Sequence, residues 1–123
     1  MVIEAVDPNK KDLKLLVKYL RMVFPCEVVM FTDPQAAADY IRDNPIDALF
    51  TEAAMLKMTG FGLQASVEVV QPAVLTVFVT HTDAYAKMAL DSRAQDYIIK
   101  PVTKVAIRNS LHGTKFGIPE GNV

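Results

Sequence analysis

Short runs of β-branched and aromatic residues alternate along this chain with longer stretches in which apolar residues recur at helical spacing. The clearest strand-like run is Val74 to Thr80, and the clearest helical stretch is Lys10 to Val23, where leucine and valine return every three or four positions. Such alternation is typical of βαβ units, whose strands pair in parallel while the helices cover the sheet. The sequence therefore predicts a doubly wound α/β domain.

Five strands and five helices are expected in this alternation. The strands are expected at Val2–Val6, Glu27–Phe31, Ala48–Glu52, Val74–Thr80 and Asp96–Ile99. The helices are expected at about Lys10–Val23, Pro34–Asp43, Phe61–Val70, Asp83–Ser92 and from the Thr103 cap to about His112. Residues 53–60 fit neither period and are expected to form a loop, in which Gly60 takes unusual backbone dihedrals.

The composition fits one packed core. Of the 123 residues, 51% are apolar, and the chain has only five Gly and seven Pro. This favours a single globular domain over disorder. Residues 1–112 are expected to form the domain. Residues 113–123 lack periodicity and contain Gly117, Pro119 and Gly121, so they are expected to be a flexible tail or a truncated linker.

Several classes of protein are not expected. The 13 Lys and Arg are scattered among 14 Asp and Glu, so there is no basic stripe for direct nucleic-acid binding. No apolar stretch approaches the roughly 20 residues of a membrane span, and the first residues lack the features of a signal peptide, so a cytoplasmic location is expected. The single cysteine, Cys26, and the distant His81 and His112 predict neither a disulfide nor a zinc site.

One local cluster of charge stands out on the first predicted helix. It consists of Lys10, Lys11, Lys14 and Lys18. The expected meaning is a solvated helix face, with partner docking as the alternative.

Polar residues follow four of the predicted strands at the same end. They are Asp7, Glu52, Thr80 and Lys100. Because function collects at the carboxyl ends of strands in an open parallel sheet, we expect these side chains to meet in one crevice. Two carboxylates, a hydroxyl and an ammonium suit a divalent cation and a phosphoryl group. The alternatives are that the two acids simply face water and that Thr80 caps a turn.

The segments around these residues resemble the receiver domain of bacterial response regulators. Asp96–Val102 is similar to the family's final strand, whose lysine precedes a cis proline, and Phe78–Thr80 is similar to the strand that ends in its switch threonine. Asp47–Met55, with Gly60, resembles the phosphoacceptor strand and loop, and Asp7 matches the first member of the family's acidic pair. The resemblance spans about residues 1–111.

The resemblance implies a flavodoxin-like (βα)5 three-layer sandwich, with a five-stranded parallel sheet in the order 2-1-3-4-5. It also implies a regulatory module of a two-component phosphorelay rather than an enzyme, with a histidine kinase or an output domain or protein as partner. By resemblance, Thr80 and Lys100 belong to the phosphate site, and Thr80 and Tyr97 form the switch. The implied output surface, also a possible homodimer contact, is the face of the fourth helix, fifth strand and fifth helix, including Tyr85, Tyr97 and Lys104.

Three positions depart from the family, and one of them is Leu56, which stands where the family has a loop proline. Glu52 stands where the family has its phosphoaccepting aspartate, and Pro8 stands where it has its second acidic residue. The resembling magnesium ligands are then Asp7, Glu52 and the carbonyl of Ala54, so magnesium binding is expected to be weak. The longer glutamate side chain should lie nearer Lys100 and off the in-line geometry of phosphoryl transfer. The expected function is a degenerate receiver that acts by protein–protein interaction, with Glu52 partly imitating the phosphorylated state.

Two other functions remain open at this point. One is a phosphorylation-competent switch that uses magnesium, which a response to magnesium and beryllofluoride would distinguish from the degenerate receiver. The other is a small flavodoxin-like enzyme, which is disfavoured because the common glycine-rich nucleotide and hydrolase motifs do not occur.

Overall fold

The computed structural model describes residues 1–117, so part of the expected tail, residues 118–123, lies outside the described residues. Strands and helices alternate through the described part. The strands are β1 (Val2–Val6), β2 (Glu27–Phe31), β3 (Ala48–Thr51), β4 (Leu75–Thr80) and β5 (Asp96–Ile99). The helices are α1 (Lys10–Val23), α2 (Pro34–Tyr40), α3 (Gly60–Val70), α4 (Ala86–Asp91) and α5 (Lys104–Ser110).

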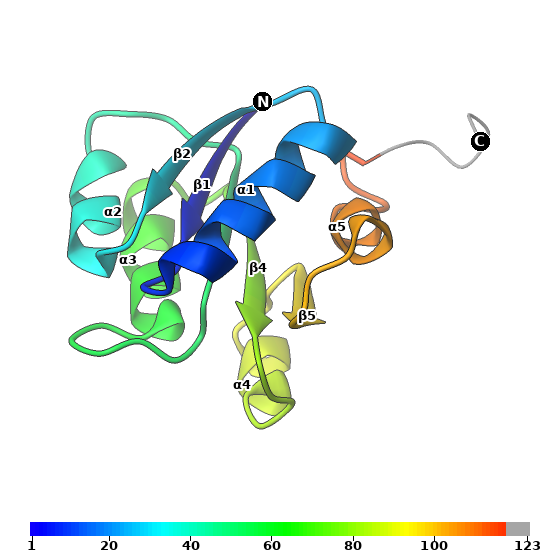
Figure 1. The fold of residues 1–123 in the computed structure, drawn as a ribbon. Helices are drawn as coiled ribbons and strands as arrows, with labels where there is room; N and C mark the ends of the chain where they lie inside the picture. The colour runs from blue at the N-terminus through cyan, green and yellow to red at the C-terminus, as the bar shows by residue number, and fades with distance from the viewer. Residues whose placement is uncertain (118–123) are drawn as a thin grey trace.

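The five strands form one parallel sheet in the order β2-β1-β3-β4-β5. Helices α1 and α5 cover one face and α2 and α3 cover the other, while α4 lies at the β5 edge (Figure 1). This confirms the predicted doubly wound α/β fold and its strand order. All five strands deliver their carboxyl ends to one edge of the sheet, which is where the predicted site residues lie.

The strands bury side chains on both faces, as expected for a parallel sheet. Ile3 and Ala5 of β1 join the core under α1 and α5, whereas Val6 joins the core under α2 and α3. On β3, Phe50 joins the core under α1 and α5, whereas Leu49 joins the core under α2 and α3. The central strands therefore have little freedom to shift, and the residues that follow them are held in fixed positions.

Some helix ends differ from the prediction. Helix α2 ends at Tyr40 rather than near Asp43, because the backbone turns after Tyr40 and the Asn44 side chain donates to the Tyr40 carbonyl oxygen at 2.8 Å. Helix α4 begins at Ala86 rather than Asp83, because Ala86 N–H closes a turn on the Asp83 carbonyl at 3.0 Å. Both helices are shorter than the apolar pattern predicts.

Gly60 corrects one expectation. Among the described residues the glycine with positive φ is Gly113, so Gly60 does not need unusual dihedrals. A Cβ atom on Gly60 would instead collide with the Glu52 carbonyl oxygen, and the Gly60 N–H donates to the Ala53 carbonyl at 2.9 Å. Glycine is therefore required by the close approach of α3 to the end of β3.

The chain beyond α5 makes a compact turn before the described part ends. Gly113 has φ 79° and Thr114 Oγ1 donates to the Leu111 carbonyl at 2.7 Å. Phe116 packs against the core cluster beneath α1 and α5. The division into residues 1–112 and 113–123 remains an expectation.

Within the described residues, no helix combines the length and the apolar character that crossing a membrane would require.

Candidate functional site

The four predicted site residues lie at the carboxyl edge of the sheet. Asp7 follows β1, Glu52 follows β3, Lys100 follows β5, and Thr80 is the last residue of β4. Backbone hydrogen bonds extend the strand pairing to these positions, with Glu52 N–H donating to Val6 at 2.9 Å and Lys100 N–H donating to Thr80 at 2.8 Å. The sheet itself thus fixes where each side chain starts.

The Lys100 ammonium is the centre of the cluster. Its Nζ atom donates to Asp7 Oδ2 at 2.7 Å, to Asp12 Oδ2 at 2.9 Å and to Glu52 Oε1 at 2.9 Å. The Lys100 side chain is only 5% exposed. The structure therefore brings together Asp7, Glu52 and Lys100 as the sequence predicts, and adds a carboxylate that the sequence analysis missed.

The missed residue is Asp12, which comes from the first turn of α1 rather than from a strand end. The Asn9 side chain caps this helix by accepting from Asp12 N–H at 3.0 Å, which fixes the first turn. An acidic residue in the first turn of a helix that follows Asp7 was the available signal. Its usual meaning, a favourable interaction with the helix dipole, gives no reason to place it in the site.

The remaining carboxylate oxygens of the two strand-end acids also accept hydrogen bonds. Asp7 Oδ1 accepts from Asn9 N–H at 2.9 Å, and Glu52 Oε2 accepts from Ala54 N–H at 3.0 Å. The Thr80 hydroxyl hydrogen-bonds to the Glu52 carboxylate as well. Every oxygen of Asp7 and Glu52 therefore has a donor from the protein.

The protonation equilibria of the cluster follow from this arrangement. Burial raises the pKa of Asp7, and the hydrogen bonds from Lys100 and Asn9 offset only part of that effect. Burial also acts to raise the pKa of Glu52, but the hydrogen bonds from Thr80, Lys100 and Ala54 outweigh it and hold that pKa below its ordinary value. Glu52 is thus the more firmly ionised of the two strand-end acids.

The other two charged groups are also held in their ionised forms. Desolvation acts to lower the pKa of Lys100, but the three carboxylate hydrogen bonds raise it above its ordinary value. The hydrogen bond from Lys100 holds the pKa of Asp12 below its ordinary value. Hydrogen bonding thus favours the ionised forms of Glu52, Asp12 and Lys100, whereas burial works against the charge on Asp7.

The fit of this site to magnesium can be tested on the same contacts. Magnesium prefers near-octahedral oxygen ligands, yet the carboxylate oxygens of Asp7 and Glu52 already accept hydrogen bonds from the protein. Within residues 1–117 no group of three or more His, Cys, Asp or Glu is arranged to hold a metal ion. In this arrangement magnesium would have to compete with Lys100 for the carboxylate oxygens of Asp7 and Glu52.

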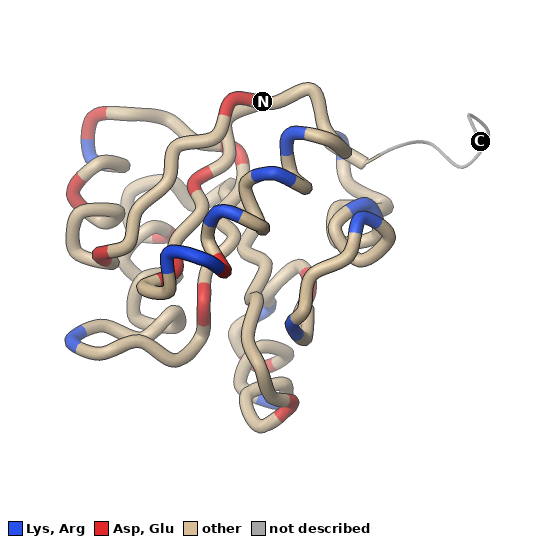
Figure 2. The backbone as a smooth tube through the Cα atoms, in the orientation of Figure 1, with Lys and Arg blue, Asp and Glu red and all other residues tan. Residues whose placement is uncertain are grey.

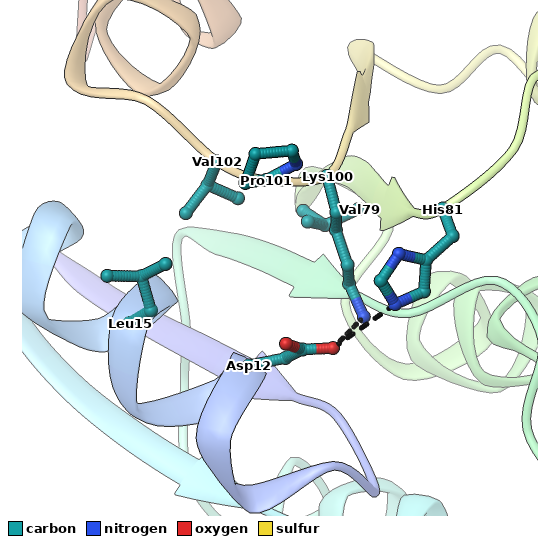
Figure 3. Close-up of a pocket in the computed structure, with 7 residues that line it drawn as sticks. All are labelled: Asp12, Leu15, Val79, His81, Lys100, Pro101 and Val102. Carbon is teal, nitrogen blue, oxygen red and sulfur yellow. Dashed lines mark hydrogen bonds and ion pairs between the residues drawn. The ribbon is translucent and has the colours of Figure 1, made fainter.

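A cavity of ≈ 130 Å³ opens beside the cluster, between α1, the end of β4 and the start of the β5–α5 connection (Figure 3). It is lined by Asp12, Leu15, Val79, His81, Lys100, Pro101 and Val102. His81 is exposed, as predicted, but its Nε2 atom also lies 3.4 Å from Asp12 Oδ2. Lys100 and Pro101 both line this cavity, and the peptide bond between them is cis, as the resemblance implies.

Tyr97 links the last strand to the loop after Thr80. Its ring packs with the small core cluster around Phe78 and Ala89, and its hydroxyl donates to the Thr82 carbonyl. The ring is half-buried, whereas the neighbouring Ile99 is 50% exposed.

The face formed by α4, β5 and α5 carries exposed apolar side chains. Leu90 is 76% exposed and Val105 68% exposed, in addition to Ile99 of β5. Tyr85 is half-buried and Lys104 is exposed on the same elements.

A different surface is basic, because Lys and Arg recur along α1 (Figure 2). There Lys10, Lys11, Lys14 and Lys18 are all exposed.

Two curated bacterial proteins are similar in sequence to this chain. The chain is 28% identical over 106 residues to the sensory transduction protein LytR of Streptococcus agalactiae serotype V, covering 86% of this chain and 43% of that protein. It is 31% identical over 97 residues to the transcriptional regulatory protein NatR of Bacillus subtilis strain 168, covering 78% of this chain and 42% of that protein. The chain thus spans less than half the length of these curated relatives.

Solved receiver structures share the fold. The response regulatory domain of protein mrkE from Klebsiella pneumoniae has a TM-score of 0.81 at 23% identity, covering 89% of this chain and 91% of that one. The receiver domain of sensor histidine kinase PA1611 from Pseudomonas aeruginosa PAO1, solved with magnesium in its active site cleft, has a TM-score of 0.73 at 17% identity, covering 85% of this chain and 88% of that one.

The model of the response regulator receiver domain matches residues 3–112, which is nearly the whole described chain. The strand order and the cluster of polar residues at the carboxyl edge of the sheet agree with that match. The chain therefore belongs to the response regulator receiver domain family.

Proposed function

We propose that this domain is a degenerate receiver, in which Glu52 occupies the phosphoacceptor position and output depends on protein interaction rather than on phosphorylation. Receiver domains of two-component systems interact with histidine kinases and with output domains. The specific claim here is that the charge on Glu52 partly replaces the charge that phosphorylation brings in other receivers.

The contact between Glu52 and Lys100 carries this proposal. Glu52 Oε1 lies 2.9 Å from Lys100 Nζ, and the Thr80 hydroxyl also bonds to this carboxylate. These are the two residues that the family resemblance assigns to a phosphoryl group. The Glu52 carboxylate thus contacts both of the residues that would otherwise bind a phosphoryl group.

The same contacts oppose phosphorylation of Glu52. A carboxylate that accepts hydrogen bonds on both oxygens, with a lowered pKa, is a weak nucleophile. The magnesium ion that assists phosphoryl transfer in other systems would also have to compete with Lys100 for the oxygens of Asp7 and Glu52. A magnesium-dependent phosphorylation switch is therefore not favoured.

The route from Glu52 to the output surface passes through Thr80 and Tyr97. Thr80 contacts Glu52, and the Tyr97 hydroxyl holds the Thr82 carbonyl two residues further along the same loop. Tyr97 belongs to β5, whose neighbour Ile99 is half exposed on the α4–β5–α5 face. On this proposal the pair Thr80 and Tyr97 holds that face in one state for a partner protein or a second copy of the domain.

The phosphorylation claim is tested with acetyl phosphate and magnesium. The wild-type protein should gain no stoichiometric acid-labile phosphate in intact-mass measurements, whereas the double variant Glu52→Asp with Pro8→Asp should gain it. Glu68→Asp, the same change on the exposed surface of α3, serves as the matched control. Stoichiometric acid-labile phosphate on Glu52 of the wild-type protein would end the proposal.

The proposal that Glu52 partly imitates the phosphorylated state is tested by removing only the charge of its side chain. Glu52→Gln should shift the amide resonances of Thr80, Tyr97 and α4 in two-dimensional NMR spectra, because it breaks the charged contact with Lys100. Glu68→Gln should leave them in place. If Glu52→Gln changed only residues next to position 52, the proposed link from the site to the output face would be wrong.

A further inference from the structure

Asp12 differs from the other acids of the cluster in origin and in exposure. It reaches Lys100 from a helix, across 88 positions of sequence, and its side chain is 26% exposed. The side chains of Asp7 and Glu52 are 4% and 9% exposed. Neither the strand-end pattern nor the family resemblance predicts a role for Asp12.

The contact with Asp12 completes the hydrogen bonding of Lys100. A lysine ammonium has three protons to donate, and Asp7, Asp12 and Glu52 each accept at 2.7–2.9 Å. No proton of Lys100 is then left for another acceptor. An anionic group that needed Lys100 would have to displace one of the three carboxylates.

Asp12 is the carboxylate that can be displaced. Asp7 and Glu52 are buried, and each has its second oxygen fixed by a backbone N–H. Asp12 instead lies at the edge of the cavity in Figure 3, where His81 offers the same oxygen a second partner at 3.4 Å. The side chain therefore has space beside it and a partner outside the cluster.

We infer that Asp12 is the residue that sets the selectivity of this site, by occupying the third proton of Lys100 and so excluding phosphoryl-like anions. This rests on the proposed function, because it explains why the Glu52–Lys100 contact persists without an external ligand. Carboxyl groups outnumber the ammonium three to one, so Asp12 also adds to the repulsion that an incoming anion meets. Asp12 acts as a positioning residue for Lys100.

The first experiment titrates beryllofluoride, at a fixed excess of magnesium, into the wild-type protein and Asp12→Asn. The amide oxygen of this variant can still accept from Lys100, but it carries no charge and holds the third proton less strongly than the carboxylate does, so the affinity should rise by roughly tenfold or more. Asp39→Asn is the matched control, because Asp39 is also a helical aspartate beside a cation, Arg42, at 3.5 Å. Asp12→Glu should restore weak binding.

Equal or weaker beryllofluoride binding by a folded Asp12→Asn variant would overturn the inference. If that variant did not fold, the exchange rate of the Lys100 ammonium protons in the wild-type protein would decide whether the three carboxylates hold all three protons. Exchange at least roughly tenfold slower than for Lys87, whose side chain is 89% exposed, is expected. Exchange as fast as that of Lys87 would show that the ammonium is not saturated.

The two proposals fail in different ways. Acid-labile phosphate on wild-type Glu52 contradicts the proposed function, whatever Asp12→Asn does. A wild-type protein that resists acetyl phosphate, together with an Asp12→Asn variant that binds beryllofluoride no better, contradicts only the role of Asp12.

Discussion

Glu4 lies in the middle of β1 with no exposed surface, and neither of its carboxyl oxygens has a hydrogen-bond partner within residues 1–117. Burial raises the pKa of Glu4 from 4.5 to about 8. Thr76, whose hydroxyl is also unpaired, lies in the same row of the sheet, since Glu4 pairs with Leu49 and Leu49 with Thr76. The inner sheet therefore carries a carboxyl group that is protonated at neutral pH and unrelated to the Lys100 cluster.

Glu4 makes stability depend on pH in a defined direction. The folded state keeps the proton between pH 4.5 and about 8, while the unfolded state loses it, so stability falls as the pH rises through that window. Glu4→Met removes the titration and the unpaired carboxyl. We expect the free energy of unfolding near pH 8 to rise by about 2 kcal/mol, with a smaller change near pH 5.

Urea unfolding at the two pH values measures this effect. Glu27→Met, on the exposed position of the neighbouring strand β2, is the control and should leave the pH dependence unchanged. A wild-type protein with equal stability at both ends of the window would contradict the assignment to Glu4.

The residues of the site differ in how far the sequence could predict them. Asp7, Glu52, Thr80 and Lys100 were predictable because parallel strands deliver the residues after them to one edge. Asp12 was not predictable, since the direction of its side chain depends on how α1 packs against the sheet and α5 and on the Asn9 cap. The protonation state of Glu4 was not predictable either, because it depends on which groups face that strand after folding.

At the scale of elements, the junction between β3 and α3 decides the position of Glu52. Gly60 begins α3 against the Glu52 carbonyl oxygen, and Thr59 caps the helix by accepting from Gly62 N–H at 3.1 Å. The loop between them is closed by the Gly60 N–H bond to Ala53. Helix α3 and the acid at the end of β3 therefore cannot move independently.

A pair of glycine variants tests this coupling. Gly60→Ala places a methyl group against the Glu52 carbonyl, so we expect it to cost about 3 kcal/mol of unfolding free energy and to shift the Glu52 amide resonance. In Gly62→Ala the added methyl group meets the flexible Met58 side chain at 3.3 Å and makes an ordinary contact with Thr59 Oγ1 at 3.6 Å, and the helix gains propensity, so this variant should stay within about 1 kcal/mol of the wild type. Equal denaturation midpoints for the two variants would show that α3 does not press on this carbonyl.

The elements themselves were largely predictable. The expected bounds of β1, α1, β2 and β5 agree with the structure, because prolines and capping residues separate clear apolar runs there. Helix α2 was predicted too long at its C-terminal end and α4 at its N-terminal end. At Tyr40 and Asp83, turn hydrogen bonds replace helical ones without changing the apolar pattern. Apolar periodicity reports which residues face the core, not which backbone bond forms at a helix end.

At the scale of the whole molecule, the charged and apolar surfaces lie on different elements. Lysines line the outer side of α1, while Leu90, Ile99 and Val105 expose apolar area on α4, β5 and α5. Exposed apolar residues on neighbouring elements are typical of interaction surfaces. Under the proposed function this face meets an output partner or a second copy of the domain.

Self-association tests the second of these partners. The wild-type domain should form dimers in sedimentation-velocity experiments at high concentration, and Ile99→Arg should weaken dimerisation by roughly tenfold or more, because it places a charge at the centre of the face. Val69→Arg, at an 85% exposed position on α3, is the control. If Val69→Arg had the larger effect, the dimer would use another surface.

At this scale the strand order was predictable from the family resemblance, which implies the order that the sheet has. The partner was not, because the chain covers 43% and 42% of the two relatives' lengths. Surface chemistry on one domain indicates where a partner binds, not which protein binds there.

The hydrogen bonds of Lys100 span almost the entire described sequence, since they join position 100 to positions 7, 12 and 52. The Lys100 ammonium thus connects the beginning and the end of the domain by hydrogen bonds. Until β5 docks, the acids at the sheet edge lack their counter-ion and repel one another. A partner that recognises this charged cluster therefore recognises a completely assembled domain, so the cluster reports the integrity of the fold.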